Sequence, residues 1–125
     1  MARRVLVVDD QFGIRILLQE VLEREGYHVE LAANGKEALD QLQKKSFDFV
    51  LLDMKIPGMD GLEILKGLRQ VQPHVKVAMM TAYGELGFVK EAIAHGAVGH
   101  FTKPFDIDEL RRFIASQVGV VPRVG

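Results

Sequence analysis

The chain has 125 residues, close to the commonest size of a single domain, and 48% of them are hydrophobic, enough for one buried core. No apolar run reaches the roughly 18 residues of a membrane span, and the run after Met-Ala-Arg-Arg is too short for a signal peptide. Sixteen basic and 17 acidic residues give a net charge of −1, without the basic excess typical of nucleic-acid binding, and the absence of cysteine excludes thiol chemistry. We therefore expect a cytoplasmic globular protein that binds neither membranes nor nucleic acid.

Short apolar runs alternate with longer amphipathic stretches along the whole chain. The predicted elements are, in order, strand 5–8, helix 13–25, strand 29–32, helix 36–45, strand 49–52, helix 62–71, strand 75–80, helix 86–94, strand 98–101 and helix 107–118. In the first helix the apolar residues are spaced by three and four, which predicts that Leu17 and Val21 belong to the core. Asn34-Gly35 marks a turn, and Asp106 is a good N-cap with Glu109 three residues further on.

This alternation predicts an α/β fold with a doubly wound, five-stranded parallel sheet. Three strands are apolar throughout, as expected for parallel strands that are covered on both faces. Right-handed crossovers favour the strand order 2-1-3-4-5, the flavodoxin-like (βα)5 arrangement. In that order the first and third strands are neighbours, and ligands bind outside the carboxyl ends of the strands there.

Polar residues follow four of the predicted strands. Asp9 and Asp10 follow the first strand, Asp53 the third, Thr81 the fourth and Lys103 the fifth. Taken singly, each has an ordinary explanation, since acids cap helices, hydroxyls close turns and lysines lie on surfaces. The predicted topology, however, brings all five to one edge of the sheet, and this convergence indicates a site.

Three carboxylates at one edge require a positive partner. Two like charges 4 Å apart repel by roughly 1 kcal/mol in water and by about 4 kcal/mol at an effective dielectric constant of 20. Lys103 offsets only part of this repulsion, so we expect Mg²⁺, with Mn²⁺ or Ca²⁺ as substitutes. A carboxylate in such a site can attack phosphorus to form an aspartyl phosphate, and Thr81 and Lys103 can donate hydrogen bonds to the phosphoryl oxygens.

Over residues 4–118 the chain resembles the receiver domains of two-component signalling. The resemblance rests on Asp9-Asp10 and on the blocks LLDMKIPGMDG, MTAYG and HFTKPF, which occur in the order typical of that family. It implies that Asp53 is the phosphoacceptor and that the domain catalyses its own phosphorylation from phosphohistidine. It implies these metal ligands: Asp9, Asp10, Asp53 and the backbone carbonyl of Lys55. It also implies that Thr81 and Lys103 bind the phosphoryl group and that the peptide bond before Pro104 is cis.

Longer blocks, such as VDDQFGIRILLQEV and KPFDIDE, are similar to the single-domain phosphorelay intermediates of sporulation. These receivers take phosphate from sensor histidine kinases and pass it to a histidine phosphotransferase. We therefore expect a receiver domain at 1–119 and a short tail at 120–125 without an output domain. We expect a monomer, with aspartyl-phosphate phosphatases as further partners.

The sequence also allows two other functions. The first is a stand-alone or truncated receiver that signals by phosphorylation-dependent partner binding, as in chemotaxis proteins or transcription factors. A metal-dependent phosphatase for small molecules is disfavoured, because no inserted segment would enclose a substrate.

The resemblance also predicts a partner-binding surface around the acid pocket. Its residues are Gln11, Phe12, Ile14, Leu18, Ile56, Pro57, Tyr83, Pro104 and Phe105. For Tyr83 and Phe105, covering the open end of the core is an equally supported role. His100 stands at the position where many receivers carry an aromatic switch residue.

Overall fold

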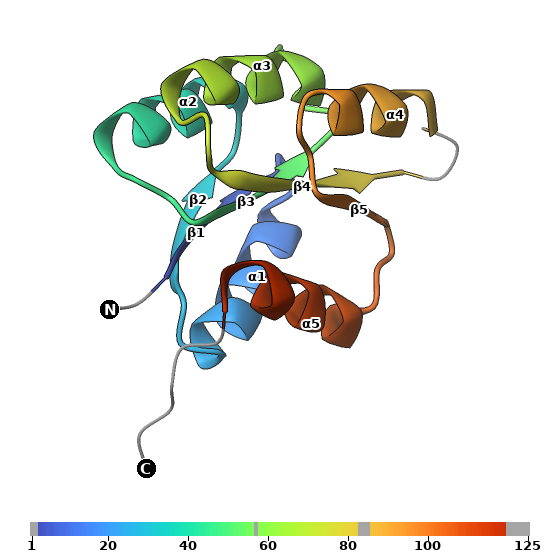
Figure 1. Ribbon diagram of the computed structural model, residues 1–125. Coiled ribbons are helices and arrows are strands. Elements are labelled where there is room, and N and C mark those ends of the chain that lie inside the picture. The colour runs from blue at the N-terminus through green and yellow to red at the C-terminus, as the bar shows by residue number, and fades with distance from the viewer. Residues whose placement is uncertain (1–2, 57, 83–85, 120–125) are drawn as a thin grey trace.

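The computed structural model describes residues 3–56, 58–82 and 86–119 (Figure 1). In this part of the chain, strands and helices alternate. They are β1 (Arg4–Val8), α1 (Phe12–Arg24), β2 (His28–Ala32), α2 (Gly35–Lys44), β3 (Phe49–Asp53), α3 (Gly61–Val71), β4 (Lys76–Thr81), α4 (Leu86–Ala94), β5 (Gly99–Thr102) and α5 (Ile107–Val118). Each predicted element is present, and each boundary lies within one residue of its expected position.

The strands form one parallel sheet in the order β2-β1-β3-β4-β5, which confirms the predicted fold class. Val8 at the end of β1 is in register with Ala32 of β2 and with Leu52 of β3. The residues that follow these positions are Asp9, just after β1, and Asp53, the last residue of β3, and they therefore lie side by side at the carboxyl edge of the sheet. The switch point of the topology thus lies where the sequence predicts it.

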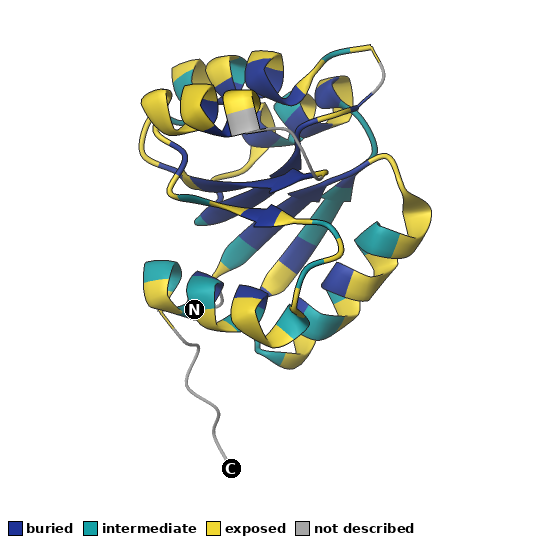
Figure 2. Cartoon of the chain, turned by 90° about the vertical axis from the view of Figure 1, so that its right-hand side faces the viewer, coloured by how far each residue is buried: buried dark blue, intermediate teal, exposed yellow. Residues whose placement is uncertain are grey.

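The core lies in two layers, one on each face of the sheet (Figure 2). Successive residues of β1 point to opposite faces, so Leu6 and Val8 pack with α2, α3 and α4, whereas Val5 and Val7 pack with α1 and α5. Every residue of β3 is buried, which explains why this strand is apolar throughout until Asp53. No helix in the described residues is long and apolar enough to cross a membrane.

Within the described residues, side chains cap the starts of α2, α3 and α5. Asn34 accepts a hydrogen bond from the Glu37 amide at the start of α2, and Asp60 accepts one from the Glu63 amide at the start of α3. Asp106 accepts hydrogen bonds from two amides of the first turn of α5, which confirms it as the N-cap. The peptide bond between Lys103 and Pro104 is cis, as the resemblance to receiver domains implies.

Candidate functional site

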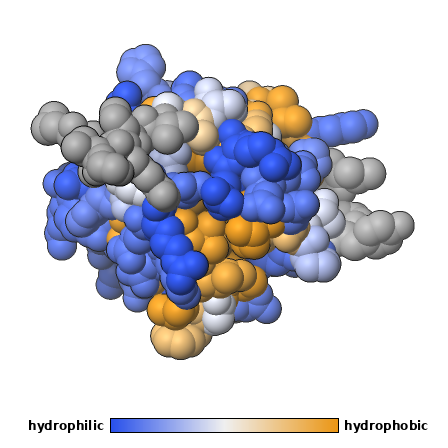
Figure 3. Space-filling view, turned by 90° about the horizontal axis from the view of Figure 1, so that it is seen from below, coloured by the Kyte–Doolittle hydropathy of each residue, from blue (hydrophilic) through white to orange (hydrophobic). Residues whose placement is uncertain are grey.

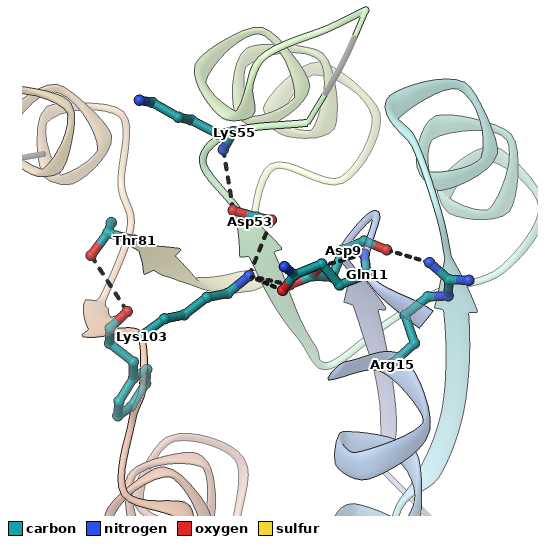
Figure 4. A network of polar contacts seen from close by, with 8 residues as sticks. Asp9, Gln11, Arg15, Asp53, Lys55, Thr81 and Lys103 are labelled. Atoms are coloured by element: carbon teal, nitrogen blue, oxygen red, sulfur yellow. Dashed lines mark hydrogen bonds and ion pairs between the residues drawn. The ribbon is translucent and has the colours of Figure 1, made fainter. Parts of the chain in front are cut away.

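Three carboxylates meet at the carboxyl end of the sheet. Figure 4 shows two of them, those of Asp9 and Asp53. Asp9 and Asp10 come from the loop after β1, and Asp53 is the last residue of β3. One oxygen from each carboxylate lies within 4.8 Å of the others. Asp9 is fully buried and Asp53 is 7% exposed, whereas Asp10 faces solvent. The predicted convergence of the three acids is therefore confirmed.

Asp9 is fixed at every polar group of its side chain and backbone. Its Oδ1 accepts a hydrogen bond from the Gln11 amide at 2.8 Å, and its Oδ2 accepts one from Lys103 Nζ at 2.7 Å. The backbone amide of Asp9 donates to the Ala32 carbonyl at 3.1 Å, and its own carbonyl accepts from Arg15 Nη1 at 2.7 Å. A fully buried carboxylate needs such partners, because an unpaired one would be strongly destabilising.

Asp53 is held less tightly. Its Oδ1 accepts a hydrogen bond from the Lys55 amide at 3.2 Å, and its Oδ2 accepts one from Lys103 Nζ at 3.3 Å. Burial raises the pKa of Asp53, and the charge of Asp9 raises it further. The hydrogen bond from the Lys55 amide and the charge of Lys103 lower this pKa but do not cancel the rise.

Lys103 is the cation of the cluster. It follows β5 and reaches both Asp9 and Asp53, with a longer contact of 3.4 Å to Gln11 Oε1 (Figure 4). Burial lowers the pKa of Lys103, but its hydrogen bonds and charge interactions with the two aspartates outweigh that effect and leave the pKa raised. The ammonium therefore keeps its charge in the neutral pH range.

The donor set fits a hard divalent cation. Among the described residues, Lys103 is the ammonium that pairs with these three carboxylates, so the cluster carries an excess of negative charge where their oxygens are close together. Oxygen ligands with this charge are those that Mg²⁺ and Ca²⁺ prefer. The residues that would hold such an ion are Asp9, Asp10 and Asp53, beside a hollow that Lys55 and Lys103 also line.

Thr81 lies at the end of β4 and is 2% exposed. Its hydroxyl points to the Phe101 carbonyl at 3.4 Å, which is long for a hydrogen bond donated by a hydroxyl (Figure 4). Little stability is lost if this hydroxyl rotates to a different acceptor. The structure thus leaves Thr81 beside the cluster with a weakly held donor.

Two residues of the predicted partner surface are buried, and these predictions need correction. Leu18 is fully buried on the inner face of α1, and Ile56 is 5% exposed within the layer beneath α2 and α3, so neither side chain can form part of an exposed surface. Leu17, which the sequence placed in the core, is instead 42% exposed. The apolar surface of α1 consists of Phe12, Ile16 and Leu17, and Figure 3 shows apolar groups between hydrophilic flanks on the side of α1 and α5.

The other predicted surface residues differ in exposure. Gln11 and Pro104 are exposed, as is His100 on β5. Ile14 and Phe105 are partly buried and pack against the core layer beneath α1 and α5. Phe105 also makes an edge contact with the ring of Phe101, with 6.5 Å between the ring centroids. Pro57 and Tyr83 lie outside the described residues.

Arg15 is a site neighbour that the sequence reasoning missed. It lies on α1 and contacts the main chain of Asp9 (Figure 4). An arginine on a helix surface carries no distinctive pattern, so only the folded arrangement reveals the contact.

The comparisons with known proteins agree with this geometry. The family model of the response regulator receiver domain matches residues 5–115. The chain belongs to this family. Among solved structures, the receiver domain resembles a CheY-like receiver protein from Methanospirillum hungatei JF-1, with a TM-score of 0.91, 32% identity and 94% of each chain covered. It also resembles the chemotaxis protein CheY4 of Vibrio cholerae, with a TM-score of 0.87, 34% identity and 94% and 99% coverage.

Curated relatives fall into two groups. The receiver domain is 57% identical over 111 residues to sporulation initiation phosphotransferase F of Bacillus subtilis (strain 168), covering 89% of this chain and 90% of that protein. It is 41% identical over 107 residues to the transcriptional regulatory protein ZraR of Klebsiella oxytoca, covering 86% of this chain. The match spans only 24% of that regulator, so whole-protein activities of the second group do not transfer to this chain.

Proposed function

We propose that this receiver domain is a phosphorelay intermediate in sporulation-type signalling. It takes a phosphoryl group from a sensor histidine kinase onto Asp53 and passes that group to a histidine phosphotransferase. The observation that carries the proposal is the Asp53 carboxylate, which ends a buried strand beside Asp9, Asp10 and the Lys103 ammonium. The 57% identity to sporulation initiation phosphotransferase F, over nearly the full length of both chains, supports the relay role.

The proposed chemistry consists of two phosphoryl transfers, in which Asp53 is first the nucleophile and then the leaving group. An oxygen of the ionised Asp53 carboxylate forms a bond to phosphorus while the N–P bond of the phosphohistidine breaks. The imidazole nitrogen leaves with the bonding electron pair. In the onward step, the histidine of the phosphotransferase attacks the same phosphorus, and the Asp53 carboxylate is the leaving group. The domain thus catalyses its own phosphorylation and serves as a carrier.

The remaining site residues bind and orient the phosphoryl group. Lys103 Nζ lies 3.3 Å from Asp53 Oδ2, close enough to donate to an oxygen of a phosphoryl group on that carboxylate. Thr81 can turn its weakly bonded hydroxyl to a second oxygen. When bound by Asp9, Asp10, Asp53 and the Lys55 carbonyl, Mg²⁺ would supply positive charge that offsets the carboxylates and the incoming phosphoryl oxygens.

Partner binding would use the apolar surface of α1, because it adjoins the acid cluster. Phe12 is 69% exposed at the first position of the helix, two residues after Asp10. Exposed apolar groups of this size beside a polar site are typical of protein contacts. Ile16, one turn further along, and the adjacent Leu17 extend the surface in place of the buried Leu18.

The transcriptional regulators of the second group share this type of domain, so the domain alone does not separate a relay carrier from a receiver that signals by partner binding. A transfer assay separates them. The protein is labelled by a sensor histidine kinase and radioactive ATP, purified, and mixed with a histidine phosphotransferase from a sporulation phosphorelay. We expect the label to leave this protein and to appear on the phosphotransferase within seconds to minutes.

The matched control is the same phosphotransferase with its phosphorylated histidine replaced by glutamine, which should receive no label. If the label is lost only as inorganic phosphate, with the active phosphotransferase as with its control, the relay role is contradicted. The signalling alternative is then favoured.

A further inference from the structure

The acid pair at the end of β1 is held in two different ways. The Asp9 carboxylate is fixed directly by the Gln11 amide and by Lys103. Asp10 faces solvent, and within the described residues no hydrogen bond holds its carboxylate. Nevertheless an Asp10 oxygen lies within 4.8 Å of oxygens from Asp9 and Asp53. Its place in the cluster therefore depends on the backbone that carries it.

That backbone is the peptide between Asp9 and Asp10. A peptide group is planar, so the direction of the Asp9 carbonyl also sets the Asp10 amide and the starting point of the Asp10 side chain. Arg15 Nη1 donates a hydrogen bond to this carbonyl at 2.7 Å (Figure 4). The guanidinium thus holds the peptide from the side of α1.

Arg15 is itself well placed for this contact. Its amide donates to the Gln11 carbonyl at 3.1 Å, so it lies one helical turn after the loop. Its guanidinium carbon lies 5.7 Å from the centre of the Phe12 ring, within the range of cation–π attraction. The side chain is only partly exposed. These contacts reduce the freedom of the guanidinium before it binds the carbonyl.

We infer that Arg15 is a positioning residue, which orients the Asp9–Asp10 peptide so that the Asp10 carboxylate completes the cation-binding cluster. The inference rests on the proposed metal-dependent function of the site. Arg15 touches neither the cation nor the phosphoryl group in this role. Substitutions of residues that orient metal ligands typically reduce metal affinity by about 10–100-fold.

A purely electrostatic effect of Arg15 would have the opposite sign. Its positive charge near the cluster repels a divalent cation, so removal of that charge alone would strengthen Mg²⁺ binding. A positioning role predicts weaker Mg²⁺ binding after the same substitution. The direction of the change therefore separates the two effects.

The test is a calorimetric titration of the full chain with MgCl₂. Arg15→Gln removes the charge and shortens the reach, and we expect Mg²⁺ to bind about tenfold more weakly. Arg15→Lys keeps a donor on a long side chain and should stay within a few-fold of the original affinity. Arg24→Gln removes the same charge from the far end of α1 and should bind Mg²⁺ as the unchanged protein does. Urea unfolding of each variant checks that the fold is intact.

A second readout needs no metal. In the metal-free Arg15→Gln protein, the NMR signals of the Asp9 carbonyl carbon and the Asp10 amide should shift, while those of β4 remain in place. Unchanged or tighter Mg²⁺ binding by Arg15→Gln overturns the inference, as does equal weakening by Arg24→Gln. If the unchanged protein and Asp10→Ala bind Mg²⁺ equally or not at all, the proposed metal site itself fails, which is a distinct result.

Discussion

The carboxyl group of Asp53 lies in an environment that disfavours its ionisation. Burial and the nearby Asp9 raise its pKa above the ordinary value of 3.8. The folded protein therefore holds this proton more tightly than the unfolded chain does. The free energy of unfolding falls as the pH rises through the interval between the ordinary pKa and the raised one. Ionisation of Asp53 therefore destabilises the metal-free fold.

Asp53→Asn should consequently stabilise the metal-free protein. At neutral pH in EDTA we expect its melting temperature to exceed that of the unchanged protein by a few degrees, because the amide carries no charge to desolvate. The contact of Lys103 with Asp9 does not involve Asp53 and should persist in this variant. The difference in melting temperature between the two proteins should narrow at acid pH, where the Asp53 carboxyl is protonated. It should also narrow on addition of MgCl₂, because the unchanged protein binds Mg²⁺ better and is stabilised more. A melting temperature below that of the unchanged protein at neutral pH would contradict this explanation.

Individual site residues were predictable to different extents. Asp9 and Lys103 each follow a strand and Asp53 ends one, so the topology alone brings them together. The hydroxyl direction of Thr81 and the contact of Arg15 with the Asp9 carbonyl depend on packing between distant segments. No periodicity or motif encodes such contacts, and they had to be found in the structure.

At the scale of the helix, α1 shows the limit of periodicity. Five of its apolar residues cover an arc of about 140° at 3.6 residues per turn, wider than the stripe that a surface helix buries: Ile14, Leu17, Leu18, Val21 and Leu22. Ile16 lies outside this arc and is exposed. The sequence does not tell which edge of this arc faces solvent. The structure places Leu17 at the exposed edge and Leu18 in the core, the reverse of the prediction.

These two neighbouring leucines should therefore respond differently to substitution. Leu18→Ala leaves a cavity in the core and should lower the free energy of unfolding by about 2–5 kcal/mol in urea titrations. Leu17→Ala should lower it by less than about 1 kcal/mol and instead slow phosphoryl transfer from the kinase. Comparable destabilisation by both substitutions would show that α1 is rotated relative to the arrangement described.

The start of α3 abuts the end of β3 at Gly61. A methyl group on this glycine would lie 2.7 Å from Met54 Cα and 2.9 Å from the Asp53 carbonyl oxygen, both backbone atoms that cannot move aside alone. The Gly61 amide donates to the Met54 carbonyl at 2.9 Å. The missing side chain thus lets the helix approach the segment that carries the proposed phosphoacceptor.

Gly61→Ala should force α3 away from this segment and lower the free energy of unfolding by about 1–3 kcal/mol. The matched control is Gly87→Ala in α4, where a methyl group would meet no atom within 4 Å and should be neutral or stabilising. Urea titration of both variants measures the difference. Equal effects of the two substitutions would contradict the proposed role of the close contact.

Over the whole molecule, the fold was predictable because each strand is a short apolar run and each helix an amphipathic stretch with its own apolar spacing. The alternation of strands and helices then left few right-handed topologies, and the observed sheet has the predicted one. The family match over residues 5–115 and the similarity to solved receiver structures agree with it. The direction of phosphate flow could not be predicted in the same way, because it depends on partner proteins that are not part of this chain.

The central claim is that Asp53 receives the phosphoryl group. The most direct measurement is the intact mass of the protein after incubation with phosphoramidate and MgCl₂, with peptide mapping of the product. The claim predicts a gain of one phosphoryl group on Asp53, released by hydroxylamine, and no gain in Asp53→Asn or in EDTA. Phosphorylation of Asp53→Asn to the same extent, or of another residue in the unchanged protein, would contradict it.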